Sequence, residues 1–233
     1  MCDDGDTSPV IETHLFSGLP EAELRRLVAL GRLRRFGSGE VVFHRGDPAG
    51  SLHLVVKGHF AARVATQRGD RVVVAVHGPG DAFGELALVD AVSRTTSVTA
   101  LEAGETLAID RDDFDRLRRE YPQVNEVLVH LLAQRIRRAS DRLLEALFVP
   151  AETRVLRRLV ELVDLYGRSG AETPISLTQT DIAALAGTSR ATANRVLRAE
   201  HERGTVRLAR GRTVVLDPEA IARRAHSPAV DRA

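Results

Sequence analysis

The strongest constraint on the fold of this chain is a series of six short runs of strand-forming residues between residues 40 and 109, with glycine-containing segments between several of them. Regularly spaced short strands with turn residues between them are typical of an antiparallel β-sandwich or β-barrel. We expect a helix from Pro20 to about Leu33 before this region, and a flexible tail over residues 1–13. The runs are Val41–Phe43, Leu52–Val56, Phe60–Val64, Val72–Val76, Ser97–Ala100 and Thr106–Ile109.

From Arg111 onward, the apolar residues recur at a helical spacing. Six of them follow one another at intervals of three or four residues, a coiled-coil-like pattern that predicts a long helix. Val149-Pro150 must end it, because proline lacks a backbone N–H and disfavours helix at the residue before it. Two interpretations remain open: the helix packs on its own β-domain, or it pairs with its copy in a homodimer. The six residues are Leu128, Leu132, Ile136, Ala139, Leu143 and Ala146.

A second domain is predicted after this helix. It begins with an amphipathic helix over residues 153–166, followed by a loop to Pro174. Thr178 and Asp181 then have the spacing of a capping box, which begins a short helix. Gly187 lies in a tight turn, and Ser189 caps a second helix that runs to about Arg203, so the pair predicts a helix-turn-helix. Two strands, 205–208 and 213–216, flank a basic connection and predict a hairpin wing.

The charge of this second domain favours a polyanionic partner. Residues 150–233 carry 14 arginines and 10 acidic residues, whereas residues 1–149 carry 19 basic and 22 acidic residues. In a helix-turn-helix the second helix enters the major groove of DNA, where Arg can pair with guanine and Asn with adenine. We therefore predict DNA binding through residues of the two helices and the wing: Thr178, Gln179, Ser189, Arg190, Ala191, Asn194, Arg195, Arg210 and Arg212.

A second candidate site lies within the predicted β-domain. Gly84 permits close approach of the backbone, and a short helix beginning nearby offers free N–H groups to an anion. Arg94 supplies a forked cation that can hold two phosphate oxygens, Thr95 adds a hydroxyl, and Glu85 is an acceptor suited to a sugar hydroxyl. The residues alone leave two readings open, an anion-binding site or a structural salt bridge between Glu85 and Arg94.

Several classes of function are not expected. With a single cysteine, Cys2, the chain cannot form an internal disulfide, and we expect no cysteine-ligated metal site. His77 is read as a surface or turn histidine rather than a haem ligand, and no metal site is predicted. We find no nucleophile–base pair, paired catalytic acids or Walker-type glycine loop, so we expect no enzyme. The chain has no run of about 18 apolar residues and no apolar signal segment, so we expect a cytoplasmic protein.

Taken in order, these motifs resemble the Crp/Fnr family of bacterial transcription regulators over roughly residues 14–222. The resemblance is carried by Gly84-Glu85-Leu86 and Arg94-Thr95, by the long helix, and by Ser189-Arg190 with Arg195. It implies an α+β fold with a cyclic-nucleotide-binding, jelly-roll-like β-roll, a dimerisation helix and a C-terminal winged helix-turn-helix. The expected boundaries are 14–120 for the β-roll, 121–148 for the helix, 149–222 for the DNA-binding domain and 223–233 for a second flexible tail.

The family also implies partners and site residues. The expected protein is a homodimer that binds a near-palindromic DNA site under the control of a cyclic nucleotide, cAMP or alternatively cGMP, and that meets RNA polymerase. By analogy, Glu85 binds the ribose 2′-hydroxyl, and Arg94 and Thr95 hold the cyclic phosphate. Gly84, Leu86 and Ala87 line the same pocket, and Ser140 reaches it from the long helix.

Two departures from the family pattern qualify this expectation. The cyclic-AMP receptor has a Thr-Ser pair on the dimer helix that meets the adenine amino group, and the matching positions here are Ala139 and Ser140. Ala191 stands where well-known members have a glutamate that accepts from cytosine, so the DNA site should differ at that base pair. The alternative is a regulator of the same family that responds to another small effector or acts without a ligand.

Overall fold

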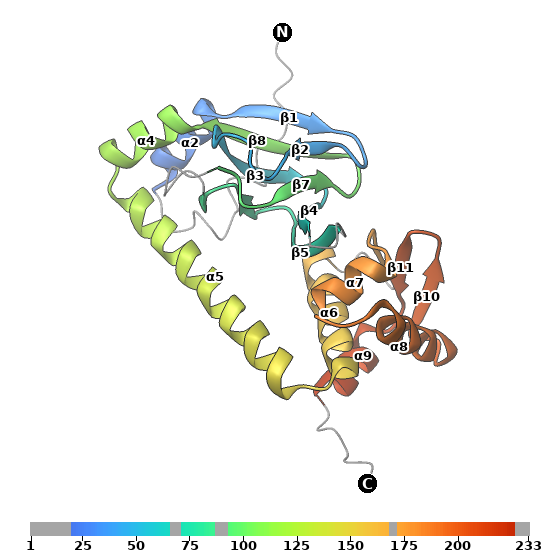
Figure 1. The fold of residues 1–233 in the computed structure, drawn as a ribbon. Helices are drawn as coiled ribbons and strands as arrows, with labels where there is room; N and C mark the ends of the chain where they lie inside the picture. Colours follow the sequence, from blue (N-terminus) through green and yellow to red (C-terminus); the bar gives the residue numbers. More distant parts are fainter. Residues whose placement is uncertain (1–19, 66–70, 87–92, 168–171, 227–233) are drawn as a thin grey trace. The chain divides into compact units, whose positions relative to one another are not determined.

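The computed structural model describes residues 20–65, 71–86, 93–167 and 172–226 (Figure 1). The chain divides into two compact units, Met1–Val64 with Ala75–Arg137 and Ala65–Val74 with Arg138–Ala233. Strand β5 (Arg71–His77) and helix α5 (Gln123–Phe148) cross the division. The predicted tail over residues 1–13 lies outside the described residues. No helix in the described ranges is long and apolar enough to cross a membrane.

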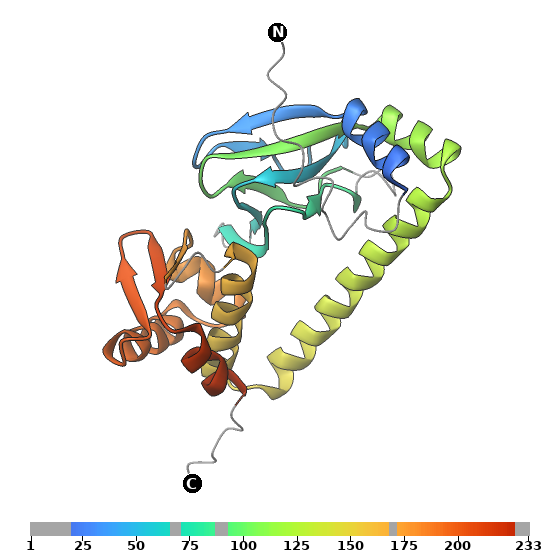
Figure 2. The ribbon, with the colours of Figure 1, turned by 180° about the vertical axis from the view of Figure 1, so that it is seen from behind.

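The first unit is a β-roll made of two four-stranded sheets (Figure 2). Strands run antiparallel in the pairs β1–β8, β8–β3, β3–β6, β2–β7 and β7–β4. The first sheet has the order β1 (Arg32–Phe36), β8 (Gly104–Asp110), β3 (Ser51–Lys57), β6 (Ala82–Phe83), and the second has β2 (Val41–Phe43), β7 (Ser97–Ala100), β4 (Phe60–Ala65), β5. The predicted antiparallel β-domain is thus confirmed.

Strand β3 is central because it is buried on both faces. Alternate residues of a strand point to opposite faces, so Leu54 packs toward helices α2 (Glu21–Leu30), α4 (Arg111–Glu120) and α5, while Val55 packs toward the second sheet. The two resulting clusters form the core of the β-roll. The helix-side cluster contains Leu24, Leu52, Leu54, Leu107, Ile109, Phe114, Leu117 and Leu128, and the inter-sheet cluster contains Phe36, Val55, Phe60, Ala62, Phe83 and Val98.

The structure corrects the predicted extent of the first helix and shows a strand that was not predicted. The first helix ends at Leu30 rather than near Leu33, and residues Arg32–Phe36 form strand β1. Gly31 turns the chain, and a Cβ there would lie 2.3 Å from Leu107 Cγ, so the backbone approaches the sheet too closely for a larger residue. Four of the five β1 residues are exposed, and the strand therefore lacks the apolar alternation by which it could have been recognised.

Helix α5 has two apolar faces. Val124 and Leu128 are buried in the helix-side core, and Leu132 packs against it. A different line of apolar residues is exposed at intervals of seven and four: Val129 (63% exposed), Ile136 (67%), Leu143 (62%) and Leu147 (66%). The predicted apolar line from Leu128 to Ala146 therefore divides: Leu128 and Leu132 pack on the chain's own β-roll, whereas Ile136 and Leu143 belong to the exposed face.

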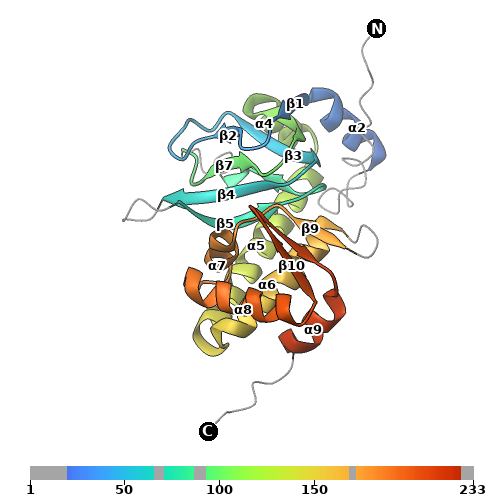
Figure 3. The same ribbon diagram turned by 90° about the vertical axis from the view of Figure 1, so that its right-hand side faces the viewer.

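The second unit is a winged helix (Figure 3). Helix α6 (Ala151–Tyr166) buries the predicted apolar face, and helices α7 (Gln179–Leu185) and α8 (Arg190–Glu202) form the helix-turn-helix. Strands β10 (Val206–Ala209), β11 (Arg212–Val215) and β9 (Thr173–Ile175) form an antiparallel sheet, in which β9 replaces the end of the predicted loop. Helix α9 (Pro218–His226) packs on α6, so residues 223–226 of the predicted tail are helical, and 227–233 lie outside the described residues.

Candidate functional site

Local hydrogen bonds fix both helices of the helix-turn-helix. The Thr178 hydroxyl accepts from the Asp181 N–H at 3.1 Å, and the Asp181 carboxylate accepts from the Thr178 N–H at 3.1 Å, so the predicted capping box is present. Ser189 Oγ accepts from the Thr192 N–H and caps α8 as predicted. Gly187 has φ +58°, a left-handed conformation that favours glycine in the turn.

The outer face of α8 carries the predicted reading residues. Arg190, Ala191 and Arg195 are exposed and Asn194 is partly buried, whereas Ala193, Val196 and Leu197 are buried in the core. Each of two outer residues has a partner: Arg195 Nη2 lies 2.8 Å from Glu152 Oε1 on α6, and Asn194 Nδ2 donates to Gln179 Oε1 at 2.5 Å. Arg198, which the sequence reasoning did not single out, is exposed on the same helix.

A polar cleft joins this face to the wing. Side chains from the start of α7, from the start of α8 and from the β10–β11 turn line it, so residues predicted separately for the helices and the wing meet in one place. Arg210 is exposed at the tip of the same wing. The cleft is lined by Leu177, Thr178, Gln179, Thr180, Arg190, Ala209, Gly211, Arg212 and Thr213.

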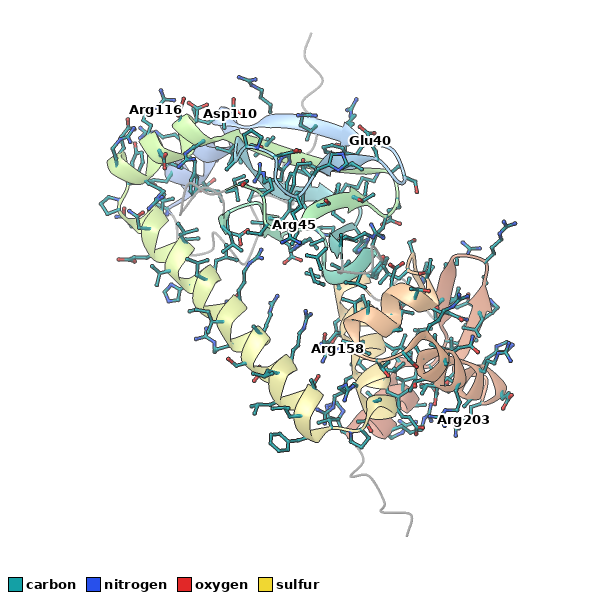
Figure 4. The ribbon with its side chains drawn as sticks, in the orientation of Figure 1. Glu40, Arg45, Asp110, Arg116, Arg158 and Arg203 are labelled. Atoms are coloured by element: carbon teal, nitrogen blue, oxygen red, sulfur yellow. The ribbon has the colours of Figure 1, made fainter. Side chains whose placement is uncertain are left out.

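Arginine contacts support the reading face. Arg154 of α6 donates to the carbonyls of Ala186 and Gly187, both at 2.9 Å, and thereby satisfies backbone acceptors at the end of α7. Glu200, 1% exposed on the inner side of α8, pairs with Arg203, which is labelled in Figure 4, and with Arg224 of α9. It also accepts a hydrogen bond from the Thr205 hydroxyl. Sequence reasoning missed these contacts, because their partners come from elements far apart in the chain.

Arg94, the residue predicted to bind the anion, lies in the first unit. The Arg94 guanidinium is 4% exposed and lies over the Phe43 ring at 4.1 Å. Its Nη1 donates to the Gly84 carbonyl at 2.9 Å and its Nη2 to the Ser51 carbonyl at 2.7 Å, while Nε has no partner among the described residues. Burial lowers the pKa of this guanidinium from its usual value. The site therefore holds a buried cation with an unused donor.

Glu85 is buried beside it but pairs with another residue. Its carboxylate is 1% exposed and pairs with Arg135 of α5, whose Nε lies 3.0 Å from Oε1 and whose Nη2 donates to Oε2 at 3.1 Å. Burial raises the pKa of Glu85, and the opposite charge of Arg135 offsets part of that effect. Among the described residues, Glu85 therefore pairs with Arg135, and the salt bridge to Arg94 that was one of the two open readings is not formed.

Gly84 is required by the geometry of this site. It has φ +86°, and a Cβ built on it would lie 2.4 Å from Arg94 Nη1. A larger residue would therefore displace the guanidinium. Of the other predicted pocket residues, Leu86 is 38% exposed and Thr95 is exposed. Ala87 lies outside the described residues, and Ser140 is exposed in the second compact unit.

The network continues to His53 on β3. Its ring contacts the hydroxyls of Ser51 and Thr106, each at 3.0 Å, and stacks on Phe83. Burial, then the charges of Arg94 and Arg34, lower the pKa of His53 to about 3. His77, interpreted from the sequence as a surface or turn histidine, is buried beside Phe83 at the end of β5. No cluster of three metal-binding side chains occurs within the described ranges.

His53 should make the fold sensitive to acid. Because the folded pKa lies below the ordinary value of 6.5, the unfolded chain takes up a proton that the native state excludes. Stability is therefore fully present above pH 6.5 and falls as the pH decreases toward 3, by up to about 1.4 kcal/mol per pH unit. His53→Gln should flatten this part of the curve of unfolding free energy against pH, measured with urea. The exposed His130→Gln serves as a control, and an equal slope in both variants would contradict the assignment.

Comparison with known proteins matches each of the two parts of the chain to a known domain family. Residues 33–121 match the cyclic nucleotide-binding domain family, and residues 153–224 match the Crp-like helix-turn-helix domain family. The chain is 30% identical to the CRP-like cAMP-activated global transcriptional regulator of Mycobacterium tuberculosis over 214 residues, covering 91% of this chain and 96% of the relative. It is 36% identical to the cyclic AMP receptor protein of Thermus thermophilus over 197 residues, covering 84% and 89%.

Solved structures show the same fold. The catabolite activator protein of Thermus thermophilus is 35% identical and matches with a TM-score of 0.53, covering 91% of this chain and 97% of that one. FixK2 of Bradyrhizobium japonicum matches with a TM-score of 0.72, covering 85% and 99%. At 23% identity, this second likeness bears on the fold alone.

Proposed function

Since the chain belongs to the Crp/Fnr family of DNA-binding transcription regulators, we propose that it is a homodimer whose affinity for DNA is set by a cyclic nucleotide. The observation that most supports a cyclic-nucleotide ligand is the buried Arg94 guanidinium, with a free Nε donor, beside the buried Glu85 carboxylate. A structural salt bridge would pair these two groups, whereas each is held separately. A cyclic phosphate next to a ribose offers the anion and the hydroxyl that such groups recognise.

Each residue has a distinct part in this proposal. Arg94 and Thr95 bind the phosphate, and Gly84 leaves the space that the guanidinium needs. Glu85 accepts a hydrogen bond from the ribose, and Arg135, by pairing with it, favours the ionised, accepting form of the carboxylate. Leu86, Ala87 and Ser140 complete the pocket as the family pattern implies. We keep the predicted domain boundaries in this proposal: 14–120 for the β-roll, 121–148 for the dimerisation helix and 149–222 for the DNA-binding domain.

The exposed face of α5 supports the homodimer. Four large apolar side chains at intervals of seven and four make the seam of a two-stranded coiled coil. An exposed line of this length is unfavourable in water, and a second copy offers the same line in return. Ser140, which the family pattern implies for the pocket, lies one turn after Ile136 on the same helix.

The regulator is proposed to act in the cytoplasm, on near-palindromic DNA and with RNA polymerase. The nucleotide is proposed to be cAMP, in line with the names of the two relatives at 30% and 36% identity. Ala139 stands where the cyclic-AMP receptor has a threonine that meets the adenine amino group, so cGMP should be tested as well. Calorimetric titration of the purified protein with cAMP and with cGMP distinguishes these two, and no heat from either would favour another effector or none.

Mutation should distinguish the residue that reads the base sequence from the residue that binds phosphate. Arg190 is exposed at the start of α8 and Arg210 at the tip of the wing. A bidentate Arg–guanine pair discriminates by about 1–3 kcal/mol, whereas an arginine on phosphate adds affinity without reading sequence. Selection from random duplexes should show that Arg190→Ala loses preference at one base pair per half-site. Arg210→Ala should weaken all duplexes alike and reduce the salt slope by about one unit. An unchanged motif with Arg190→Ala, or selected sites without two-fold symmetry, would contradict this docking.

A further inference from the structure

The side-chain amide of Asn194 is held by a second amide. Asn194 lies in the second turn of α8, and its Nδ2 donates to Oε1 of Gln179 at 2.5 Å. Gln179 is the first residue of α7, and the capping box formed by Thr178 and Asp181 fixes its backbone. Both amides are partly buried, and Gln179 lines the cleft beside Arg190. The pair therefore lies where the two helices meet, at the reading face.

This hydrogen bond determines what Asn194 can offer to a base. An asparagine amide has two N–H donors and one oxygen acceptor. Gln179 uses one N–H and leaves the oxygen and the other N–H, which is the donor–acceptor pair that adenine N7 and N6 require in the major groove. Turning the Asn194 amide alone would set its oxygen against Oε1 of Gln179, so the contact as it stands favours one orientation, and the inverted pair requires both amides to turn together.

The orientation matters because guanine differs from adenine at one edge atom. Guanine presents the acceptor O6 where adenine presents the donor N6. An unrestrained asparagine amide can rotate to donate to O6, whereas the amide held by Gln179 directs its oxygen toward that position and repels guanine. Discrimination between the two purines thus depends on the restraint as well as on Asn194.

We propose that Gln179 is a positioning residue that holds the Asn194 amide for adenine, so that the pair specifies one A·T base pair in each half-site. The inference rests on the proposed binding of DNA and adds to it the determinant of one base. Gln179 acts through Asn194, and its carbonyl oxygen is the atom that does so.

The test is selection from random duplexes with the full-length protein, with and without cAMP or cGMP, followed by competition between A and G at the affected position. Asn194→Ala should reduce the preference for A about tenfold, and Gln179→Leu, which cannot accept a hydrogen bond, should do the same at the same position. Gln179→Glu should retain the preference, because a carboxylate still accepts. The double variant Gln179→Leu with Asn194→Ala should show no further loss, as expected for residues that act as one unit.

Thr180→Ala provides the matched control, because Thr180 is exposed in the same cleft next to Gln179; it should keep the preference. Thermal unfolding of each variant checks that the domain remains folded. The proposal is overturned if Gln179→Leu keeps the preference for A, if it weakens all duplexes alike, or if Asn194→Ala leaves the motif intact, and in those cases the proposed regulator still stands. A wild-type protein that selects no site overturns the proposed function and this inference together.

Discussion

Replacement of Arg94 by leucine is expected to abolish the binding of cyclic nucleotide. The guanidinium is the buried cation of the β-roll site, and two charge-assisted hydrogen bonds to a phosphate are worth about 1.5–3 kcal/mol each. Their loss lowers affinity on the order of a hundredfold or more. Calorimetric titration with cAMP and cGMP measures this change, and Arg94→Lys should recover only part of the affinity, because lysine cannot use the forked geometry.

Arg45→Leu is the matched control for this substitution. Arg45, labelled in Figure 4, is exposed next to Gly46, whose N–H donates to the Arg94 carbonyl. The Arg45→Leu substitution therefore removes the same charge close to the site without removing a residue of the site. Arg94→Leu leaves the carbonyls of Ser51 and Gly84 without their donor, and circular dichroism should therefore accompany the titrations. Retained affinity for every nucleotide tested in a folded Arg94→Leu protein would exclude this site.

Two glutamates on α5 are expected to convert the dimer into monomers. Ile136 and Leu143 are 67% and 62% exposed and lie seven residues apart, so both occupy the proposed seam. The double variant Ile136→Glu with Leu143→Glu would bury like charges against each other, at several kcal/mol for each unpaired charge. Light scattering at micromolar concentration should give the mass of one chain, and binding to a palindromic duplex should weaken with it.

The control for this experiment lies on the same helix. Gln134 is exposed away from the apolar line, and Gln134→Glu adds a negative charge without entering the seam. It should remain a dimer. The variant Leu132→Glu gives a different result, because Leu132 packs against the β-roll core and its replacement should lower stability. A dimer that survives the Ile136 and Leu143 substitutions would mean that the subunits meet elsewhere.

The parts that sequence predicted well are those determined by local signals. The capping box of Thr178 and Asp181 and the cap at Ser189 need only neighbouring residues, and both helices begin where these residues indicate. Strand Ser97–Ala100 was likewise recognisable from its own composition. Propensity and capping act within a few residues, so a single sequence suffices for them.

The parts that sequence missed depend on contacts between distant segments. Glu85 pairs with Arg135, which is 50 positions away, and nothing near Glu85 indicates this partner. The helical periodicity of α5 could have indicated this partner, because Arg135 lies seven residues after Leu128, on the side of α5 that faces the β-roll core. The restraint of Asn194 by Gln179 is similar, since it forms only when the two helices pack together.

The division of α8 into two sides bears on how such a protein can diverge. Glu200 and its arginine partners anchor the inner side, whereas Arg190, Ala191 and Arg195 on the outer side contribute nothing to the buried core. Surface substitutions of this kind change folding stability by about half a kcal/mol or less. After gene duplication, a copy can therefore acquire a new set of target promoters through changes at the outer positions while its fold is preserved.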